Sequence, residues 1–322
     1  MSFKIVRFFL FLFDPETIHN IIIFLLQLKP VQWILKCFYT YEHSKLERNF
    51  LGLRFPNPIG LAAGFDKNGK ALIGLQALGF GFIEVGTVTP QPQSGSPRPR
   101  IFRFPKEKAL LNWMGFNNDG VDRVVQRIAS QRPKLHIPIG LNIGKNKDTP
   151  LEKAADDYLY CVEKAYSEVD FFVVNISSPN TPQLRVLQEG EHIVNLLSRL
   201  STVKQKKPIL IKLSPDISDE TLKFVIEQID KIPFAGIVVT NTMAAYPKGG
   251  TSGTPLFQKS NDLLKKSREY ANSPLIISGV GGILSPDDAK QKFNLGADLI
   301  ELYTGLIYSG PGLVKRIKQS LL

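Results

Sequence analysis

The chain has 322 residues, of which 43% are hydrophobic and 21% are charged, so its composition is that of a globular protein with a sizeable core. The formal net charge of +11 favours anionic partners, such as a phosphorylated cofactor, a carboxylate substrate, anionic lipid or nucleic acid, without choosing among them. The two cysteines, Cys37 and Cys161, belong to no CxxC pair and no His/Cys cluster, which argues against a disulfide or a zinc site. We interpret both as small buried hydrophobic residues and expect no metal.

The amino terminus contains two short apolar runs, at residues 8–13 and 21–26. A basic segment precedes the first run as in a signal peptide, but the run is too short and no small-residue cleavage site follows it. Both runs also fall short of the ~20 residues that span a bilayer, so we expect no transmembrane helix. We predict a pair of apolar helices instead, the second capped by Asp14 and carrying Pro15 at its first position.

From residue 59 onward, short apolar strands alternate with amphipathic helices. Strands are predicted at 59–63, 82–87, 138–142, 171–176, 208–213, 235–240, 274–278 and 299–303. Helices are predicted near 70–78, 119–130, 151–168, 189–204, 217–229, 257–270, 285–295 and 311–321. Such alternation is typical of a parallel sheet covered by helices, and eight units favour a closed (β/α)8 TIM barrel over the alternative, an open doubly wound sheet. We therefore expect an N-terminal helical extension (1–45) and a barrel (46–322).

Two segments lie outside this repeat. Residues 48–58 predict a small hairpin before the first barrel strand, at the bottom of the barrel. Residues 88–118 form a long insertion rich in Pro, Gly, Arg and Asn. Since loops longer than about 12–15 residues in a compact domain are usually functional, we expect this insertion to contribute to a site.

Polar residues or glycines stand at the carboxyl end of every predicted strand, where barrel enzymes have their active sites. Any one of them could be an ordinary turn residue, but a buried polar group without a partner costs about 1–3 kcal/mol, so the whole set needs a ligand or water. Gly281 and Gly282 follow the seventh strand, where backbone N–H groups of barrels commonly bind phosphate. Lys212 is predicted to point inward, and a fixed cation near a flavin would stabilise its reduced form.

Several segments closely resemble the dihydroorotate dehydrogenase family, and the resemblance covers nearly the whole chain. NISSPNTP is highly specific, whereas SGVGGI alone would be a weak signal. The matching segments are GLAAGFDKNG (60–69), EVGTVTPQPQSGSPRPRIFRFP (84–105), NWMGFNN (112–118), VNISSPNTPQLR (174–185), IKLSPD (211–216), VTNT (239–242), SGVGGI (278–283) and LYTGLIYSGPGL (302–313).

The resemblance implies an enzyme of pyrimidine biosynthesis that oxidises dihydroorotate to orotate with FMN. By motif position, the flavin-binding residues are Ala63, Gly64, Thr87, Asn142, Asn175, Lys212, Thr240, Gly253, Gly282, Tyr303 and Thr304. The substrate-binding residues are Lys67, Asn112, Gly115, Phe116, Asn175, Asn180, Asn241 and Thr242. Ser178 falls at the position of the catalytic base, which takes a proton from C5 of the substrate while a hydride leaves C6 for the flavin. A serine needs a relay for that proton, and Thr181 is the nearest hydroxyl in the motif; Phe116 would screen the reaction from water.

Serine at this position, together with the apolar extension, resembles the class that passes electrons to a membrane quinone. His19, Ile22, Ile23 and Leu26 share one helical face, which suits the wall of a quinone tunnel. The resemblance implies that His19, Arg103 and Tyr303 lie near the quinone head. It also implies peripheral contact with the lipid bilayer, on the cytoplasmic side of the cell inner membrane, and no nucleic-acid partner.

Two positions depart from the family pattern: Trp113 stands where an arginine is usual, and Thr251 where a leucine is expected. Three alternative functions predict different features. A soluble dehydrogenase of the same family would carry a cysteine base and lack the extension. A flavin barrel that reduces uridine in transfer RNA would have a catalytic cysteine and a further RNA-binding domain. An inactive membrane scaffold would tolerate loss of Ser178, Lys67 or Asn180, and all three are present.

Overall fold

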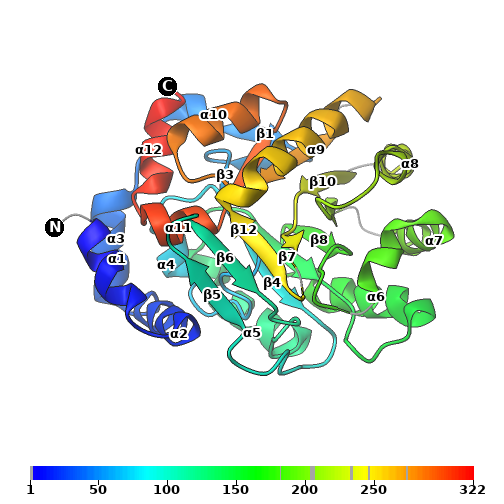
Figure 1. The fold of residues 1–322 in the computed structure, drawn as a ribbon, viewed down its shortest axis with the longest axis horizontal. Coiled ribbons are helices and arrows are strands. Elements are labelled where there is room, and N and C mark those ends of the chain that lie inside the picture. The colour runs from blue at the N-terminus through cyan, green and yellow to red at the C-terminus, as the bar shows by residue number, and fades with distance from the viewer. Residues whose placement is uncertain (1–2, 182, 204–206, 233–234, 246, 273–274) are drawn as a thin grey trace.

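Eight parallel strands close into a barrel in the computed structural model, which describes residues 3–181, 183–203, 207–232, 235–245, 247–272 and 275–322 (Figure 1). The strands follow one another around the barrel in chain order, so the predicted closed barrel is confirmed and the doubly wound alternative is wrong. They are β3 (Ile59–Leu61), β4 (Phe82–Val88), β7 (Ile139–Ile143), β8 (Phe171–Asn175), β9 (Ile209–Leu213), β10 (Ala235–Val239), β13 (Ile276–Val280) and β14 (Leu299–Leu302).

Helices cover the outside of the barrel near the predicted positions. They are α4 (Leu72–Gln76), α5 (Val121–Gln131), α6 (Ala154–Ala165), α7 (Gly190–Ser201), α8 (Asp219–Ile229), α9 (Phe257–Tyr270), α10 (Pro286–Asn294), α11 (Thr304–Ser309) and α12 (Leu313–Ser320). Single 3-10 turns lie at η1 (Ser44–Leu46), η2 (Arg132–Lys134), η3 (Leu151–Lys153), η4 (Leu184–Gln188) and η5 (Thr254–Leu256). The short α11 was not predicted. The predicted end of one helix at residue 204 and the predicted start of one strand at residue 274 lie outside the described residues.

Alternate residues of each strand point into the barrel, and they form layers of different polarity. The lowest layer is aromatic, because Phe82 packs edge-on against Phe171 and against Phe55 with ring centroids 6.1 and 5.5 Å away. Phe55 comes from the antiparallel hairpin β1 (Arg48–Phe50) and β2 (Leu53–Phe55), which confirms the hairpin predicted at 48–58 and its place at the barrel bottom. The next layer is polar and carries Glu84 and Lys212.

The long insertion contains a hairpin rather than an irregular loop. Its strands β5 (Ile101–Phe104) and β6 (Ala109–Asn112) pair with each other. Strand β6 also pairs with β12 (Gly250–Gly253), which pairs in turn with β11 (Met243–Ala244). In Figure 1, β5, β6 and β12 lie in front of the barrel strands. The segments of this small sheet lie about 140 residues apart in the chain, since Asn112 pairs with Gly250. A local sequence pattern therefore does not predict the sheet.

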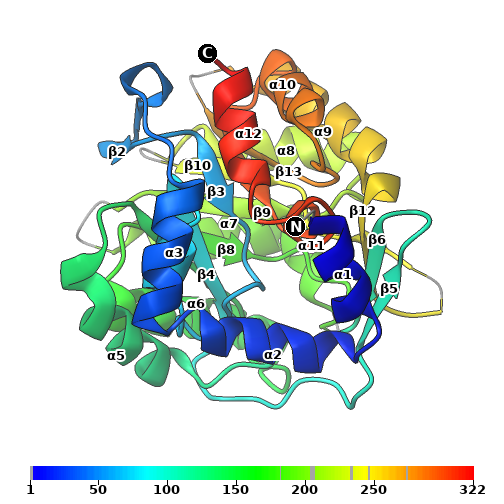
Figure 2. The ribbon, with the colours of Figure 1, turned by 90° about the vertical axis from the view of Figure 1, so that its left-hand side faces the viewer.

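The amino terminus forms three helices rather than the predicted pair: α1 (Phe3–Phe11), α2 (Pro15–Leu25) and α3 (Lys29–Tyr39). Figure 2 shows α2 running between α1 and α3 across one side of the barrel. The cap on α2 is confirmed, because the Asp14 carboxylate accepts a hydrogen bond from the Thr17 N–H at 2.8 Å. In the described residues no single helix could cross a membrane, although α2 and α3, bent by 92°, reach the length and composition of a span together.

The three helices turn large apolar side chains to the surface. Most exposed large hydrophobic residues of the described chain lie here: Ile5, Phe8, Phe9, Leu12, Phe13, Ile21, Phe24, Leu25, Leu28, Trp33, Ile34 and Phe38. The prediction that both cysteines are buried holds for Cys161 but is wrong for Cys37, which is exposed on α3. Only one face of α3 packs against the barrel, so Cys37 on its outer face has nothing to cover it.

Candidate active site

A cavity lies between the carboxyl ends of the barrel strands and the β5–β6–β12 sheet, since residues of both line it. The predicted gathering of polar groups at one rim of the barrel is confirmed. The residues singled out from the sequence that line this cavity are Ala63, Gly64, Lys67, Thr87, Asn112, Gly115, Phe116, Asn175, Ser178, Asn180, Lys212, Thr240, Asn241, Thr242, Gly253, Gly282, Tyr303 and Thr304.

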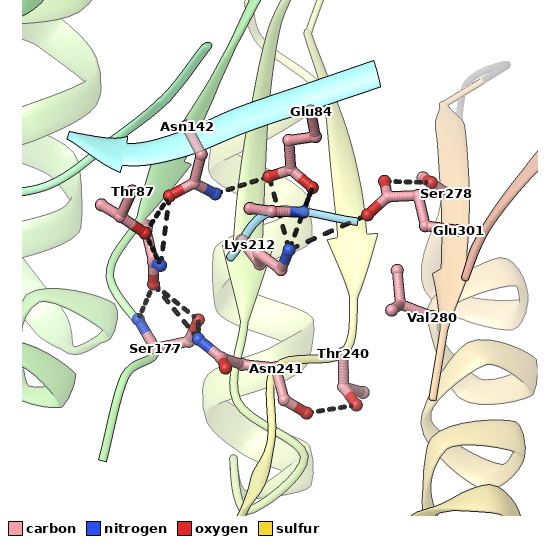
Figure 3. Close-up of polar contacts among 12 residues, drawn as sticks. Glu84, Thr87, Asn142, Ser177, Lys212, Thr240, Asn241, Ser278, Val280 and Glu301 are labelled. Atoms are coloured by element: carbon pink, nitrogen blue, oxygen red, sulfur yellow. Dashed lines mark hydrogen bonds and ion pairs between the residues drawn. The ribbon is translucent and has the colours of Figure 1, made fainter. Parts of the chain in front are cut away.

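Asn142 does not line the cavity but organises residues that do (Figure 3). Its Oδ1 accepts a hydrogen bond from the Thr87 hydroxyl at 2.5 Å, and its Nδ2 donates to Glu84 Oε1 at 2.5 Å. Asn175 Nδ2 donates to both Thr87 and Asn142, at 3.0 and 3.2 Å. This connected network fixes which way each amide points, because every donor in it already has an acceptor.

Lys212 points inward as predicted, but two partners were missed in the sequence. Its ammonium lies 3.1 Å from Glu84 Oε2 and 3.8 Å from Glu301 Oε2, and all three side chains are buried. Burial alone would lower the pKa of Lys212, but the two carboxyl groups outweigh it and raise that pKa. Lys212 is therefore a permanent cation in the floor of the cavity. The alternation along β4 and β14 could have placed Glu84 and Glu301 there, since both follow an inward-facing apolar residue at i−2.

A cluster of amides stands at the ends of β8 and β10. Asn175 Oδ1 accepts hydrogen bonds from Asn241 Nδ2 and the Ser177 hydroxyl, both at 3.2 Å, and Asn241 Nδ2 also donates to Ser177 Oγ at 3.0 Å. In the loop after β8, Asn180 Nδ2 lies 3.4 Å from Oδ1 of Asn112, the last residue of β6. Amides offer paired donors and acceptors in one plane, which is the pattern that the edge of a planar heterocycle presents.

Ser178 lies on the wall of this cavity in the loop after β8, 5% exposed. Its Oγ accepts a hydrogen bond from the Asn180 N–H at 3.2 Å, so it also stabilises the turn. Arg185 ties the loop to the barrel, because its Nε donates to the Ser177 carbonyl at 3.1 Å and its Nη1 pairs with Asp216 at 3.0 Å. Thr181, the predicted relay, is buried nearby in the same loop.

Glycines form the end of the cavity where a phosphate was predicted. Gly253, Gly281 and Gly282 line it with φ values of +94°, +115° and +73°, which favour glycine. A Cβ on Gly282 would lie 2.5 Å from Phe257 Cβ, so no other residue fits without displacement. A phosphorylated flavin therefore fits the donor set: a cradle without side chains at one end, and the Lys212 cation with the amide network at the other.

Lys67 also lines the cavity, and its Nζ donates a hydrogen bond to the Gly64 carbonyl at 2.8 Å. Burial lowers the pKa of Lys67 to about 8, and the charge of Arg100 acts in the same direction. Arg100 is itself held by a buried ion pair with Glu16 of α2, at 2.7 Å, which the sequence did not reveal. This pair fastens the amino-terminal helices to the insertion.

A second cavity of about 410 Å³ lies between the amino-terminal helices and the barrel, and its walls are mostly apolar. His19, Arg103 and Tyr303, the residues predicted for the quinone site, all line it. Tyr303 also lines the first cavity, as do Ile101 and Leu110, so the two cavities adjoin. In the described part of the chain no group of three or more His, Cys, Asp or Glu residues could hold a metal.

His19 packs against an aromatic residue at the edge of this cavity. Its ring packs edge-on against Phe65 at 5.2 Å between centroids, and Phe65 packs against Tyr303 at 5.7 Å. Burial lowers the pKa of His19 to about 4, so the imidazole is neutral at neutral pH. Ile22 and Leu26 line the cavity with it as predicted. Ile23 does not line it: this side chain is 8% exposed and packs into the hydrophobic core.

The two residues that depart from the family pattern, Trp113 and Thr251, line neither of the two cavities. The Trp113 ring packs on Phe102 with 4.8 Å between centroids, and the Lys248 ammonium lies 4.3 Å from the Trp113 ring; Trp113 lines an outer groove and neither of the two cavities. Thr251 lies opposite Leu111 in the small antiparallel sheet.

Comparisons with known proteins agree with one another. The family model for dihydroorotate dehydrogenase matches residues 45–322. Relatives named dihydroorotate dehydrogenase (quinone) include one from Christiangramia forsetii, 44% identical across 99% of this chain and 98% of the relative, and one from Acinetobacter baumannii, 41% identical across the full length of both. Among solved structures, the Eimeria tenella enzyme in complex with ferulenol superposes with a TM-score of 0.84 at 34% identity, over 96% of this chain and 91% of that one.

Proposed function

Because this chain belongs to the dihydroorotate dehydrogenase family, we propose that it oxidises dihydroorotate to orotate, with FMN as the hydride acceptor and a membrane quinone as the final electron acceptor. The observation that carries this proposal is the pair of adjoining cavities. One is polar and gathers Lys67, Ser178 and the amides; the other is apolar, and Tyr303 belongs to both. Two substrates of opposite polarity can therefore reach one shared cofactor from different sides.

FMN, when bound, would accept the hydride from the substrate and later give its electrons to the quinone. We assign its binding to the floor and the glycine end of the polar cavity: Ala63, Gly64, Thr87, Asn142, Asn175, Lys212, Thr240, Gly253, Gly282, Tyr303 and Thr304. Lys212 would hold the electron-rich end of the ring system, and the glycine backbone at 253 and 282 would leave room for the phosphate.

The substrate would lie against Lys67, Asn112, Gly115, Phe116, Asn175, Asn180, Asn241 and Thr242. We assign Ser178 as the base that removes the proton at C5. Among the described residues the Ser178 oxygen accepts a hydrogen bond from the Asn180 N–H, so its own hydroxyl proton is free to be passed on. Phe116 is buried and lines the cavity, and it keeps bulk water from this side of it.

Lys67 makes substrate affinity depend on pH. The orotate carboxylate binds the charged form of Lys67, which predominates below a pKa of about 8 and is lost above it. We therefore expect orotate to bind about tenfold more weakly at pH 9 than at pH 7, as the charged fraction falls. Titration of the flavin spectrum with orotate at each pH measures this, and a Lys67→Met variant should bind weakly with no such decline. An unchanged affinity in wild type up to pH 9 would contradict the assignment.

We propose that residues 1–45 form a quinone- and lipid-binding extension to the catalytic barrel of residues 46–322. The exposed aromatic and aliphatic side chains of α1–α3 support peripheral insertion into a bilayer, in a chain whose charge of +11 favours anionic lipid. We propose the cytoplasmic side of the cell inner membrane as the location, by resemblance to the quinone-dependent class. Flotation with vesicles of anionic lipid tests the contact, and Phe8→Ser with Trp33→Ser should weaken it.

The test of the whole proposal is anaerobic. The purified protein is mixed with dihydroorotate while the visible absorption of the flavin is followed, and then a ubiquinone analogue, fumarate or NAD is added. Bleaching by the substrate and recovery with the quinone alone is the expected result. A protein without a flavin band, or with a band that dihydroorotate leaves unchanged, would contradict it. Recovery with fumarate or NAD would favour the soluble class instead.

A further inference from the structure

Glu301 is a buried carboxyl group to which the reaction above gives no role. It points into the barrel from β14, is 2% exposed and lines the floor of the polar cavity (Figure 3). The Ser278 hydroxyl donates to its Oε1 at 2.6 Å. No donor among the described residues satisfies its Oε2, which lies 3.8 Å from the Lys212 ammonium. An ionised carboxylate with one oxygen that lacks a donor is costly in a buried position.

The charges in this layer do not balance when every group is ionised. Glu84 already pairs closely with Lys212, at 3.1 Å, so an ionised Glu301 would add a second negative charge to one positive charge. The elements packed against Glu301 offer no other compensation, since β13 presents Ser278 and Val280, and β3 presents Gly60 opposite it. Burial and the neighbouring Glu84 raise the pKa of Glu301 well above its usual range, although Lys212 opposes them.

We propose that Glu301 binds a proton when electrons enter the cofactor and releases it when they leave, and that it thereby couples the reduction potential of the bound flavin to pH. This inference rests on the proposed function. Hydride transfer adds one negative charge to the cavity whose floor holds Lys212, Glu84 and Glu301. A neutral Glu301 leaves Lys212 more able to stabilise that charge than an ionised one does. The proton that Glu301 takes up comes from the solvent and returns there on oxidation by quinone, so atoms and charges balance over the cycle.

The experiment compares full-length, flavin-loaded wild type with Glu301→Gln in a spectroelectrochemical titration across pH. Glutamine keeps the size of the side chain and can still accept from Ser278. A tenfold change in proton concentration shifts a two-electron couple by about 30 mV for each proton bound. As the pH rises through the range in which Glu301 titrates, the reduction potential should therefore fall more steeply in wild type than in the variant. The expected difference in slope is about 30 mV per pH unit. Equal slopes at every pH, with flavin bound in both, would overturn the proposal.

A matched variant separates titration of Glu301 from a mere change of packing. Ser278→Ala keeps the carboxyl but removes its hydrogen bond, which favours the ionised form. The extra slope should persist in Ser278→Ala and move to higher pH. If Glu301→Gln does not retain flavin, the infrared difference spectrum between reduced and oxidised wild type tests the proposal instead. A band of a protonated carboxyl group should grow on reduction. Absence of that band would overturn the proposal. Failure of dihydroorotate to bleach the flavin of wild type would instead contradict the proposed function.

Discussion

The Ser178→Ala variant is expected to retain its flavin and to be reduced by dihydroorotate roughly 10²- to 10⁴-fold more slowly than wild type, the usual contribution of a positioned base. Ser178 lines the cavity, and its oxygen accepts the hydrogen bond from the Asn180 N–H. Removal of the hydroxyl leaves Lys67 and the amides in place. Affinity for orotate should therefore change little, and the loss should appear in the rate of the chemical step.

Stopped-flow reduction of the flavin under anaerobic conditions measures this rate directly. The variant Ser178→Cys is the informative control, because a thiol restores a base with an ordinary pKa of ~8.5 and its rate should climb as the pH approaches that value. Ser177→Ala removes the neighbouring hydroxyl, which bonds to Asn175 and Asn241 rather than lining the cavity. Its smaller effect would show that loop distortion alone does not explain the loss. Normal reduction of Ser178→Ala would remove Ser178 from the role of base.

The barrel could be predicted because each of its elements is encoded locally. Runs such as residues 171–176 and 208–213 are wholly apolar apart from one polar residue at the end, which indicates a strand buried on both faces with a functional group at its rim. Parallel strands bring all such ends to one side of the sheet, so the site followed from the fold. The strand ends differ from the prediction by at most two residues, since hydrogen bonding to neighbours decides where a strand stops.

The features that escaped prediction depend on contacts between distant segments. The Glu84–Lys212 pair joins residues 128 apart, and the Glu16–Arg100 pair joins residues 84 apart. The sequence around Glu84 or Glu16 does not indicate which basic residue each of them pairs with. The helix α3 did have a sequence signal, because Pro30 in its first turn is followed by apolar residues at helical spacing. Its lysines interrupt the apolar run, so the segment was not predicted as a helix. The short α11 contains Gly305 and ends at Gly310, and glycines favour a loop in a sequence-based prediction.

The Ile22→Trp variant is expected to impair oxidation of the reduced enzyme by quinone, about tenfold to a hundredfold, while reduction by dihydroorotate stays normal. Ile22 lies on α2 and lines the apolar cavity near His19, and an indole there would occupy space that the quinone needs. Overfilling a packed apolar site costs about 1–3 kcal/mol, and 1.4 kcal/mol corresponds to a factor of ten. This variant is preferable to deletion of residues 1–40, which would leave Arg100 buried without the Glu16 carboxylate.

The neighbouring residue supplies the matched control. Ile21 lies one position earlier on α2, is 47% exposed and lines neither cavity, so Ile21→Trp adds the same side chain outside the tunnel. Single-turnover mixing measures each half-reaction separately: flavin reduction by dihydroorotate, then reoxidation by a ubiquinone analogue. Reoxidation should be slow in Ile22→Trp and normal in Ile21→Trp. Equal slowing of both half-reactions in Ile22→Trp would place the quinone elsewhere or make the two cavities one site, because a block confined to a separate tunnel cannot reach Ser178 or Lys67.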